Sequence, residues 1–347
     1  MIPSNFVAAL ERRNAGRPPV WFMRQAGRYH SHYQRLKSRH SFVDLCRVPE
    51  LACEVALGPI EDFDFDAAIL FSDLLFPLEA MGMPLAYTPG PSLGWHVRSV
   101  ADVERLRSGV ELASELEFQS DALRRTRARL ARGKGLLGFI GGPLTLYCYA
   151  AVGSHQHDLA IARAGVDEGI FAAFCDRLRP LLAANLVAQS RSGADVVAIL
   201  DTCAGEITAA QFGQHVVPEL EKLLAEAVGL GLRTPVLYYS KGTSPEYWDR
   251  LGDLPIQGLG VDWRCSVADV LRRYGGHWAI QGNFDPERLR DARADLDHDL
   301  RAFFEPVAAL PATLRRGWIC GLGHGVLQQT PEGNVRRFME LQREYFS

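Results

Sequence analysis

The chain has 347 residues, of which 47% are hydrophobic and 23% charged, with a formal net charge of −3. This is the balance of an ordinary globular protein with enough apolar residues for a sizeable core. The charge argues against nucleic acid or an anionic membrane as partner. No apolar run approaches the roughly 18 residues that span a bilayer, and the first residues do not resemble a secretory signal.

The cysteines are odd in number, scattered along the chain and never spaced as CxxC. This pattern favours a reducing, cytoplasmic setting in which the thiols are simply buried. The seven cysteines are at positions 46, 53, 148, 175, 203, 265 and 320.

Eight short apolar runs recur along the chain, each ending in a polar or glycine-rich turn, and they are predicted to be β-strands. In chain order they are Pro19–Arg24, Ala67–Asp73, Leu136–Gly141, Ala194–Asp201, Pro235–Lys241, Ile256–Asp262, Trp278–Asn283 and Trp318–His324. Between them lie predicted helices, which include Ser99–Leu106, Phe171–Gln189, Ala209–Val228, Pro245–Leu251 and Val267–Tyr274.

Eight apolar strands that alternate with helices indicate a parallel sheet covered on both faces. Eight is the number that closes a (β/α)8 barrel, and we predict such a barrel as one domain over residues 1–347. The alternative is an open doubly wound sheet. No GxGxxG follows the first strand to support the dinucleotide site that often accompanies that fold.

In a barrel of this kind the catalytic groups lie at the C-terminal ends of the strands. Polar residues do follow the apolar runs here. Some of them could instead cap the next helix, a role that suits Asp201, Asp262 and Asn283. The strand-end residues are Arg24, Asp73, Asp201 with Thr202, Lys241, Asp262, Asn283 and His324.

The segment from Arg24 to Arg28 follows the first predicted strand. Its two arginines flank Gln25, Ala26 and Gly27, small or polar residues that let a ligand approach the backbone. Arginine offers a planar fork for bidentate contacts to carboxylates. The segment therefore suits a ligand with several carboxylates, although two surface arginines paired with helix acids would give the same pattern.

Asp73 follows the second apolar run, where a carboxylate is expected to be half-buried. It could accept several N–H bonds, such as those of pyrrole rings, and stabilise a developing cation. It could equally be a helix N-cap.

Three further segments offer polar groups at the predicted barrel mouth. Tyr149 lies beyond a Gly-Gly-Pro turn, with Tyr147 as the competing phenol. Thr202 offers a hydroxyl donor, and His324 stands among glycines, where it titrates near neutrality and can donate to a carboxylate.

Taken together, these motifs resemble the uroporphyrinogen decarboxylase family. The resemblance runs from about residue 18 to 346, and its first and last motifs are specific. The matching segments are PVWFMRQAGRY, FDAAILFSDLLFPLEAMGM, GFIGGPLTL, LDTCAG, LGVDW, QGNFDP and GLGHGVLQQTPEGNV.

The resemblance implies a cofactor-free, metal-free homodimer that converts the four acetate side chains of uroporphyrinogen III to methyls and releases CO2. It implies that Arg24 and Arg28 hold substrate carboxylates, with Gln25, Ala26 and Gly27 completing the binding loop. Asp73 would bind the pyrrole N–H groups and steady the cationic intermediate. Tyr149, Thr202 and His324 would contact the substrate.

The chemistry explains why no cofactor would be needed. Protonating the pyrrole first creates an electron sink conjugated to the breaking bond. Arg24, Arg28 and Asp73 are the candidate catalytic residues, and the proton donor is either Arg24 or a water that Arg24 relays, because arginine is a poor acid.

The chain also departs from the family pattern, and this keeps three alternatives open. His30, Ser31 and His32 replace a usual Leu-Pro-Glu, and residues 150–157, with His155 and His157, replace a glycine-rich run. A paralogous decarboxylase of another carboxylated heteroaromatic, or a tetrapyrrole-binding barrel without turnover, would fit. The third alternative is a corrinoid methyltransferase. Such an enzyme would carry a His-x-Cys zinc pair at the positions where this chain has Tyr239 and Lys241, which are not a likely set of zinc ligands.

Overall fold

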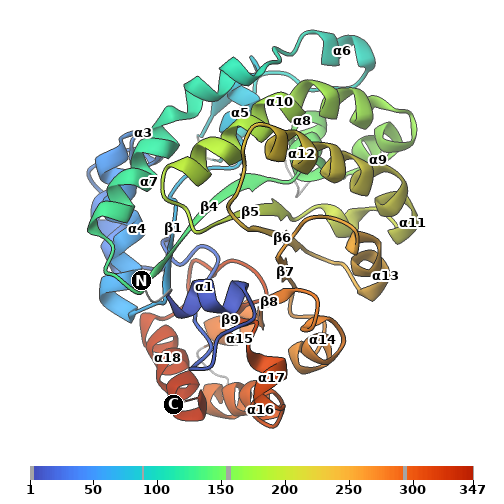
Figure 1. Ribbon diagram of the computed structural model, residues 1–347. Helices are drawn as coiled ribbons and strands as arrows, with labels where there is room; N and C mark the ends of the chain where they lie inside the picture. Colours follow the sequence, from blue (N-terminus) through green and yellow to red (C-terminus); the bar gives the residue numbers. More distant parts are fainter. Residues whose placement is uncertain (1–3, 88–89, 154–157, 292–294, 347) are drawn as a thin grey trace.

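The computed structural model describes residues 4–87, 90–153, 158–291 and 295–346. Its centre is a curled sheet of seven parallel strands in the order β1-β4-β5-β6-β7-β8-β9, surrounded by helices (Figure 1). The strands are β1 (Ala67–Ile69), β4 (Gly135–Gly141), β5 (Val196–Asp201), β6 (Val236–Ser240), β7 (Gly258–Gly260), β8 (Ala279–Phe284) and β9 (Trp318–Leu322).

The first predicted strand, Pro19–Arg24, is not a strand of this sheet, and that expectation is corrected. Val20 makes only an isolated parallel bridge to Cys320. Prolines at 18 and 19 provide no N–H for a ladder, and the chain turns at Arg24, whose φ is 60°.

The Val20 segment nevertheless fills the eighth position of the barrel. On one side the Trp21 N–H donates to the Cys320 carbonyl at 3.1 Å, and on the other the Asp66 N–H donates to the Val20 carbonyl at 2.9 Å. The segment therefore joins β9 to the start of β1 and closes the ring.

The helices that follow the strands cover the outside of the sheet. They are α4 (Pro49–Phe63), α5 (Phe76–Ala80), α6 (Val100–Glu104), α7 (Glu117–Arg129), α8 (Pro143–Val152), α9 (Ala160–Asp167), α10 (Ile170–Arg191), α11 (Ala209–Gln211), α12 (Val217–Gly229), α13 (Pro245–Trp248), α14 (Val267–Tyr274), α15 (Pro286–Arg290), α16 (Leu296–Ala308), α17 (Ala312–Arg315) and α18 (Glu332–Phe346).

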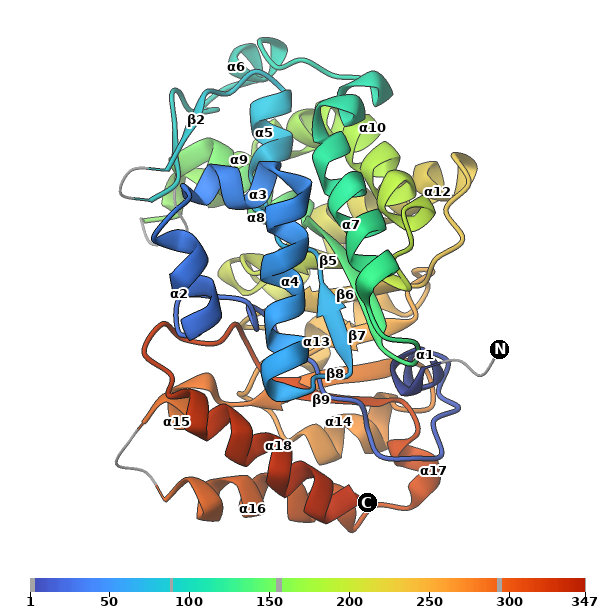
Figure 2. The same cartoon turned by 90° about the vertical axis from the view of Figure 1, so that its left-hand side faces the viewer.

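Shorter elements complete the fold. Helices α1 (Asn5–Leu10), α2 (Ser31–Lys37) and α3 (Phe42–Arg47) precede α4, and Figure 2 shows α2 and α3 beside it. An antiparallel pair, β2 (Leu85–Ala86) and β3 (Ser92–Leu93), lies apart from the barrel sheet. The remaining turns are the 3-10 segments Val110–Leu116, Ala204–Glu206 and Asp249–Leu251 and a π-turn, Phe212–Val216.

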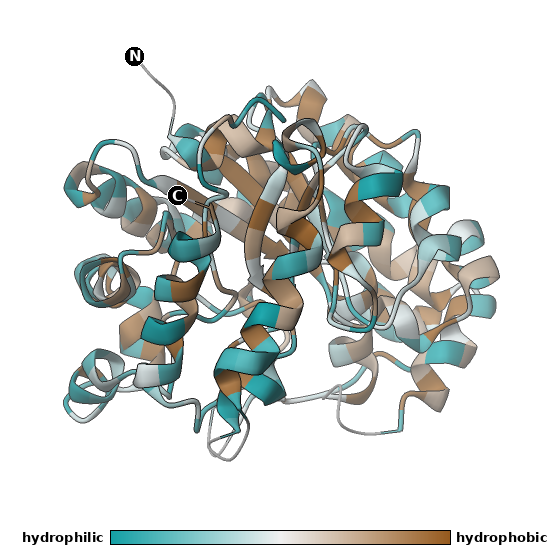
Figure 3. Ribbon diagram, turned by 90° about the horizontal axis from the view of Figure 1, so that it is seen from below, coloured by the Kyte–Doolittle hydropathy of each residue, from teal (hydrophilic) through white to brown (hydrophobic). Residues whose placement is uncertain are grey.

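Every residue of the seven barrel strands is buried. Helices cover the outer face, so the strands are apolar runs rather than alternating ones. Apolar colour accordingly collects on the central strands and the inward sides of the helices (Figure 3). Within the described ranges, none of the helices has the length and apolar character needed to cross a bilayer.

Candidate active site

Arg24 begins the first loop at the C-terminal end of the barrel. Its backbone is left-handed, with φ at 60°, a conformation that a non-glycine residue adopts at an energetic cost and that often marks a functional turn. Its side chain lies over Gly325, where an added Cβ would come within 2.4 Å of the arginine Cδ. The loop after β9 therefore leaves room for this guanidinium because it carries a glycine there.

Gln25 anchors the same loop from below. Its side chain is fully buried; the amide nitrogen donates to the Ala67 carbonyl at 2.9 Å, and the amide oxygen accepts from the Phe22 N–H at 3.3 Å. The Tyr29 hydroxyl donates to the Gln25 carbonyl at 2.8 Å. Gln25 thus holds the loop in place, and its side chain is not available to a ligand. Ala26 is also buried, and Gly27 lies where a Cβ would meet the Arg24 carbonyl at 3.0 Å.

Arg28, like Arg24, is exposed. The Gln328 side-chain oxygen, when it faces the guanidinium, accepts from Arg28 Nη1 at 2.9 Å and from Nε at 3.1 Å. Burial raises the pKa of Tyr33, and the Arg28 charge opposes that rise. The structure thus places Arg28 between the loop after β9 and α2.

Asp73 lies beyond β1 and is half-buried. One oxygen accepts from the Leu75 N–H at 2.9 Å, which stabilises the turn before α5; the N-cap of that helix is Leu75, so the capping alternative for Asp73 is wrong. Burial raises the pKa of Asp73 above its usual 3.8, and the Leu75 N–H, the nearby Tyr87 hydroxyl and the Arg24 charge oppose that rise. The carboxylate is therefore poised to gain from any additional positive charge or N–H donor.

The two candidate tyrosines of α8 point in different directions. Tyr147 packs between Phe171 and Phe174, with ring centroids 5.4 and 5.5 Å away. Tyr149 is half-buried, and burial raises the pKa of its phenol, which also senses the charges of Asp73 and Arg24. Tyr149 is the phenol at the barrel mouth.

Thr202 is half-buried directly after β5, and its neighbour Asp201 is a structural residue. The Asp201 carboxylate accepts from the Thr145 N–H at 2.9 Å, from the Thr145 hydroxyl at 2.6 Å and from the Tyr238 hydroxyl at 3.1 Å. It thereby holds the first turn of α8, the helix that follows the neighbouring strand β4, and, contrary to the prediction, does not cap the element after its own strand. Burial raises the pKa of Asp201, and these bonds oppose the rise.

His324 is held by a residue to which the sequence analysis gave no role. The Tyr239 hydroxyl lies 3.0 Å from His324 Nδ1 and donates to the Gly323 carbonyl at 2.8 Å. The two rings are stacked, with centroids 6.1 Å apart. Burial raises the pKa of Tyr239, while Arg24 is among the charges that lower it. Tyr239 thus connects β6, across the barrel, to the loop after β9.

Asp262 and Asn283 organise the loops after β7 and β8. Asp262 accepts from the Gly242 N–H at 2.6 Å and pairs with Arg264, and the Asn283 amide donates to the carbonyls of Asp262 and Cys265, both at 2.8 Å. Both residues therefore hold loops in place, but neither is the predicted cap of the next helix, because Ser266 caps α14 and Asp285 caps α15.

The histidine segments do not form a metal centre in the described part of the chain. His30 bonds Asp62 at 2.7 Å and His32 lies 3.4 Å from Glu54, so both rings turn toward α4. No group of three or more His, Cys, Asp or Glu suited to a metal occurs among the described residues. His155 and His157 lie outside those residues.

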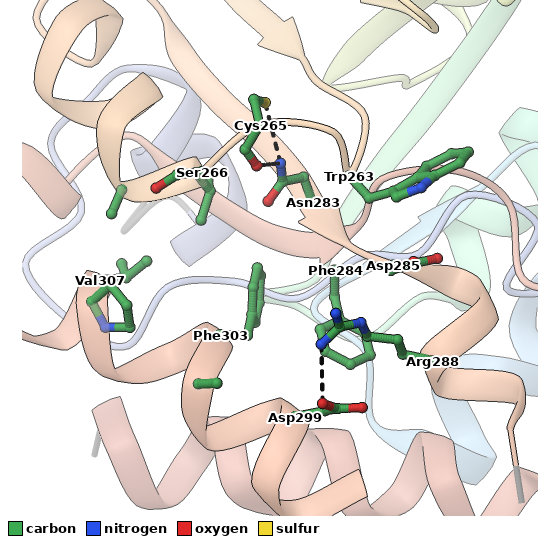
Figure 4. A pocket seen from close by; sticks show the side chains of 14 residues that line it. Trp263, Cys265, Ser266, Asn283, Phe284, Asp285, Arg288, Asp299, Phe303 and Val307 are labelled. Carbon is green, nitrogen blue, oxygen red and sulfur yellow. Dashed lines mark hydrogen bonds and ion pairs between the residues drawn. The ribbon is translucent and has the colours of Figure 1, made fainter. Parts of the chain in front are cut away.

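A separate cavity of about 390 Å3 lies beside the mouth, between the loop after β7 and helices α14, α15 and α16 (Figure 4). Its charged groups already have partners: Arg288 pairs with Asp299 at 3.0 Å, and Asp285 caps α15. None of the candidate site residues lines it.

Comparisons with known proteins identify the family of the chain. Residues 2–345 match the family model of uroporphyrinogen decarboxylase. The chain belongs to the uroporphyrinogen decarboxylase family. It is 35% identical to the uroporphyrinogen decarboxylase of Pelobacter propionicus, over 96% of both chains, and 35% identical to that of a Roseiflexus species, over 99% of both chains. The resemblance stated from the motifs is confirmed.

Solved structures show the same fold at low identity. A methyltransferase from Methanosarcina mazei is 18% identical, with a TM-score of 0.76 over the full length of both chains. A putative vitamin-B12-independent methionine synthase from Listeria monocytogenes is 10% identical, with a TM-score of 0.57 over 96% of this chain and 97% of that one. These likenesses concern the fold alone, and with the family they confirm the predicted α/β barrel.

Proposed function

We infer that the protein decarboxylates uroporphyrinogen III to coproporphyrinogen III in porphyrin and heme biosynthesis. Membership of the family carries this conclusion, and the convergence of Arg24, Asp73 and Tyr149 on one end of the barrel supports it. A carboxy-lyase of this kind replaces each acetate carboxylate by one proton and releases CO2.

We propose that Asp73 stabilises the cation formed when a pyrrole ring is protonated. Burial disfavours the charged carboxylate, so an adjacent positive ring stabilises it more there than in water. The oxygen that does not hold the Leu75 N–H is the one offered to pyrrole N–H donors.

Arg24 supplies the charge beside Asp73 and is the proposed carboxylate ligand of the reacting arm. A guanidinium has too high a pKa to be a good acid, so a water that Arg24 positions competes with it as the proton source. Arg28, Thr202 and His324 are proposed to bind the other carboxylates, with the Gly27 and Ala26 backbone close to the ring. The protonated ring is itself the electron sink, so the proposal requires no cofactor.

The structure removes one reason to favour a different substrate. His30 and His32 depart from the family pattern, but their rings pair with Asp62 and Glu54 on α4. They therefore stabilise the segment behind the binding loop instead of lining the mouth.

The deciding experiment is anaerobic turnover of reduced uroporphyrinogen III by chelator-treated enzyme, with products separated after oxidation. Formation of coproporphyrinogen and CO2 is the expected result. Tight binding without CO2 would identify a non-catalytic tetrapyrrole-binding barrel. Neither binding nor turnover would assign the chain to a paralogue with another substrate.

We further propose one catalytic domain over residues 1–347, a homodimer and a cytoplasmic location. The family resemblance supports the dimer, and the seven free cysteines suit a reducing compartment. Light scattering of the purified protein tests the dimer: a mass of one chain, 38.5 kDa, would contradict it.

A further inference from the structure

The order of strands around the barrel defines two opposite walls of the mouth. Starting from the Val20 segment, the ring runs through β1, β4, β5, β6, β7, β8 and β9 back to Val20. β6 is therefore four positions from the Val20 segment in either direction. The loop that carries Arg24 and the loop after β6 face each other across the mouth.

Lys241 is the first residue after β6, and the register directs it toward the barrel axis. Tyr239 points inward, because its hydroxyl reaches the Gly323 carbonyl beyond β9. Side chains alternate along a strand, so Lys241, two residues later, leaves the chain on the same face. Asp201 pairs with Ser240 in register, which places Lys241 beside Thr202, a proposed substrate contact.

The backbone around Lys241 is held on both sides. Its carbonyl accepts from the Gly205 N–H at 3.0 Å, and the following N–H, that of Gly242, donates to Asp262 at 2.6 Å. Gly242 has φ 75°, which allows the chain to turn away immediately. The lysine stem therefore has a fixed starting point and direction.

The ammonium group of Lys241 has no hydrogen bond or ion pair with any residue in the described ranges, although the residue is half-buried. The carboxylate that follows β7, Asp262, is already engaged by the Gly242 N–H and by Arg264. The ammonium group is therefore available to an anionic ligand, which would accept a charge-assisted hydrogen bond from it.

We propose that Lys241 binds a carboxylate side chain of the macrocycle at the wall opposite Arg24. The inference rests on the proposed function, because a ring with carboxylates around its whole edge needs cations on more than one side. Arg24, Arg28 and His324 all lie at the β9–β1 side of the mouth, and Lys241 supplies the positive charge on the β5–β6 side.

The test uses the full-length enzyme and three variants. Lys241→Gln removes the charge, Lys241→Arg keeps it, and Lys37→Gln removes the charge of an exposed lysine of α2 as the matched control. Three quantities are measured anaerobically: the Kd for coproporphyrinogen III, which has carboxylates but no acetate arm to lose, and KM and kcat with uroporphyrinogen III.

Lys241→Gln is expected to weaken binding and raise KM roughly 10- to 100-fold, the effect of losing one charge-assisted hydrogen bond. Lys241→Arg should recover most of the loss, and Lys37→Gln should match the wild type. Equal binding by Lys241→Gln and wild type would overturn the proposal. So would equal impairment of both Lys241 variants together with a lower Tm, which indicates a structural role. A wild-type protein that neither binds nor turns over would instead overturn the proposed function itself.

Discussion

Asp73 and Asp201 look alike in the sequence, since each follows an apolar run that ends a strand of the barrel. Their surroundings differ. Asp201 is fully buried, and protein donors engage both of its oxygens. One oxygen of Asp73 accepts a hydrogen bond from the Leu75 N–H. The carboxylate also lies near the Tyr87 hydroxyl and the Arg24 charge. The number of hydrogen bonds that a carboxylate accepts from protein donors therefore separates the structural Asp201 from the candidate catalytic Asp73.

Replacing Asp73 by asparagine tests the proposed catalytic role. The amide oxygen can still accept from Leu75, so the free energy of unfolding should change by less than about 1 kcal/mol. The negative charge opposite the cationic ring is lost, and kcat should fall roughly 100-fold or more. Steady-state kinetics and denaturant unfolding are the two measurements. A loss of stability in proportion to the loss of activity would assign Asp73 to a structural role alone, through its bond to the Leu75 N–H.

Replacing Asp201 by alanine should give the opposite pattern. Three buried donors, the Thr145 N–H, the Thr145 hydroxyl and the Tyr238 hydroxyl, lose their acceptor. We expect the free energy of unfolding to fall by about 2 kcal/mol, with kcat per folded molecule changed less than kcat of Asp73→Asn. Denaturant unfolding and active-site-normalised kinetics measure this. An unchanged stability would contradict the structural assignment.

At the scale of elements, the sequence predicts the buried strands well, because parallel strands covered on both faces are apolar throughout. Leu136–Gly141 and Trp278–Asn283 correspond to β4 and β8 to within a residue at each end. The prediction was wrong for Pro19–Arg24, where the apolar pattern is that of a strand but the pairing stops at Val20. It also missed the π-turn that divides the predicted helix Ala209–Val228. Hydrophobic patterns report burial, whereas pairing length and helix continuity depend on tertiary contacts.

The segment between the Arg24 loop and α2 should make stability depend on pH. His30 is fully buried, and burial lowers the pKa of its ring below the usual 6.5, with Asp62 and Glu332 opposing this and His32 adding to it. As pH falls below 6.5, the unfolded chain therefore takes up a proton before the folded protein does. The free energy of unfolding contributed by this residue is complete above pH 6.5 and is lost as pH decreases.

His30→Leu should reduce that dependence, because a leucine suits the buried site against Phe63 and does not titrate. The measurement is the free energy of unfolding at pH 7.5 and 5.5 for wild type, His30→Leu and His298→Gln, the last an exposed histidine of α16. The decrease from pH 7.5 to 5.5 should be smaller in His30→Leu and unchanged in His298→Gln. Equal decreases in all three proteins would refute the assignment.

At the scale of the whole molecule, the sequence could predict which strand ends meet but not which side chains meet there. Parallel strands bring Arg24, Asp73, Thr202 and His324 to one end of the barrel, as expected. The role of Tyr239 was missed: it lies within a buried strand, and only the three-dimensional register shows that its hydroxyl crosses to Gly323 and His324. The choice between Tyr147 and Tyr149 likewise depended on what packs against α8.

The seam that closes the barrel contains a carboxylate beside the Val20 segment, in addition to its backbone hydrogen bonds. Asp66 accepts from the Val20 N–H at 2.7 Å and pairs with Arg17 at 2.7 Å. The same arrangement recurs inside the sheet, where Asp195 accepts from the Leu136 N–H at 2.8 Å and pairs with Arg127 at 3.0 Å. The two aspartates are therefore matched in chemistry and differ in position, since only Asp66 lies at the seam of the ring.

Replacing either aspartate by alanine should lower the free energy of unfolding, by about 3 kcal/mol for Asp66, because a largely buried cation and an N–H both lose their partner. Only Asp66→Ala should loosen the seam. The Trp21 and Cys320 amides, which join the Val20 segment to β9, should then exchange hydrogen faster than in the wild type, while the Leu136 amide responds mainly to Asp195→Ala. Because Arg24 lies just beyond this seam, Asp66→Ala should also raise KM more than Asp195→Ala does.

Equal hydrogen exchange at the Trp21 amide in the two variants would contradict this prediction. The barrel would then close without help from Asp66, and the position of Arg24 would depend on its contacts with Gln25 and Gly325.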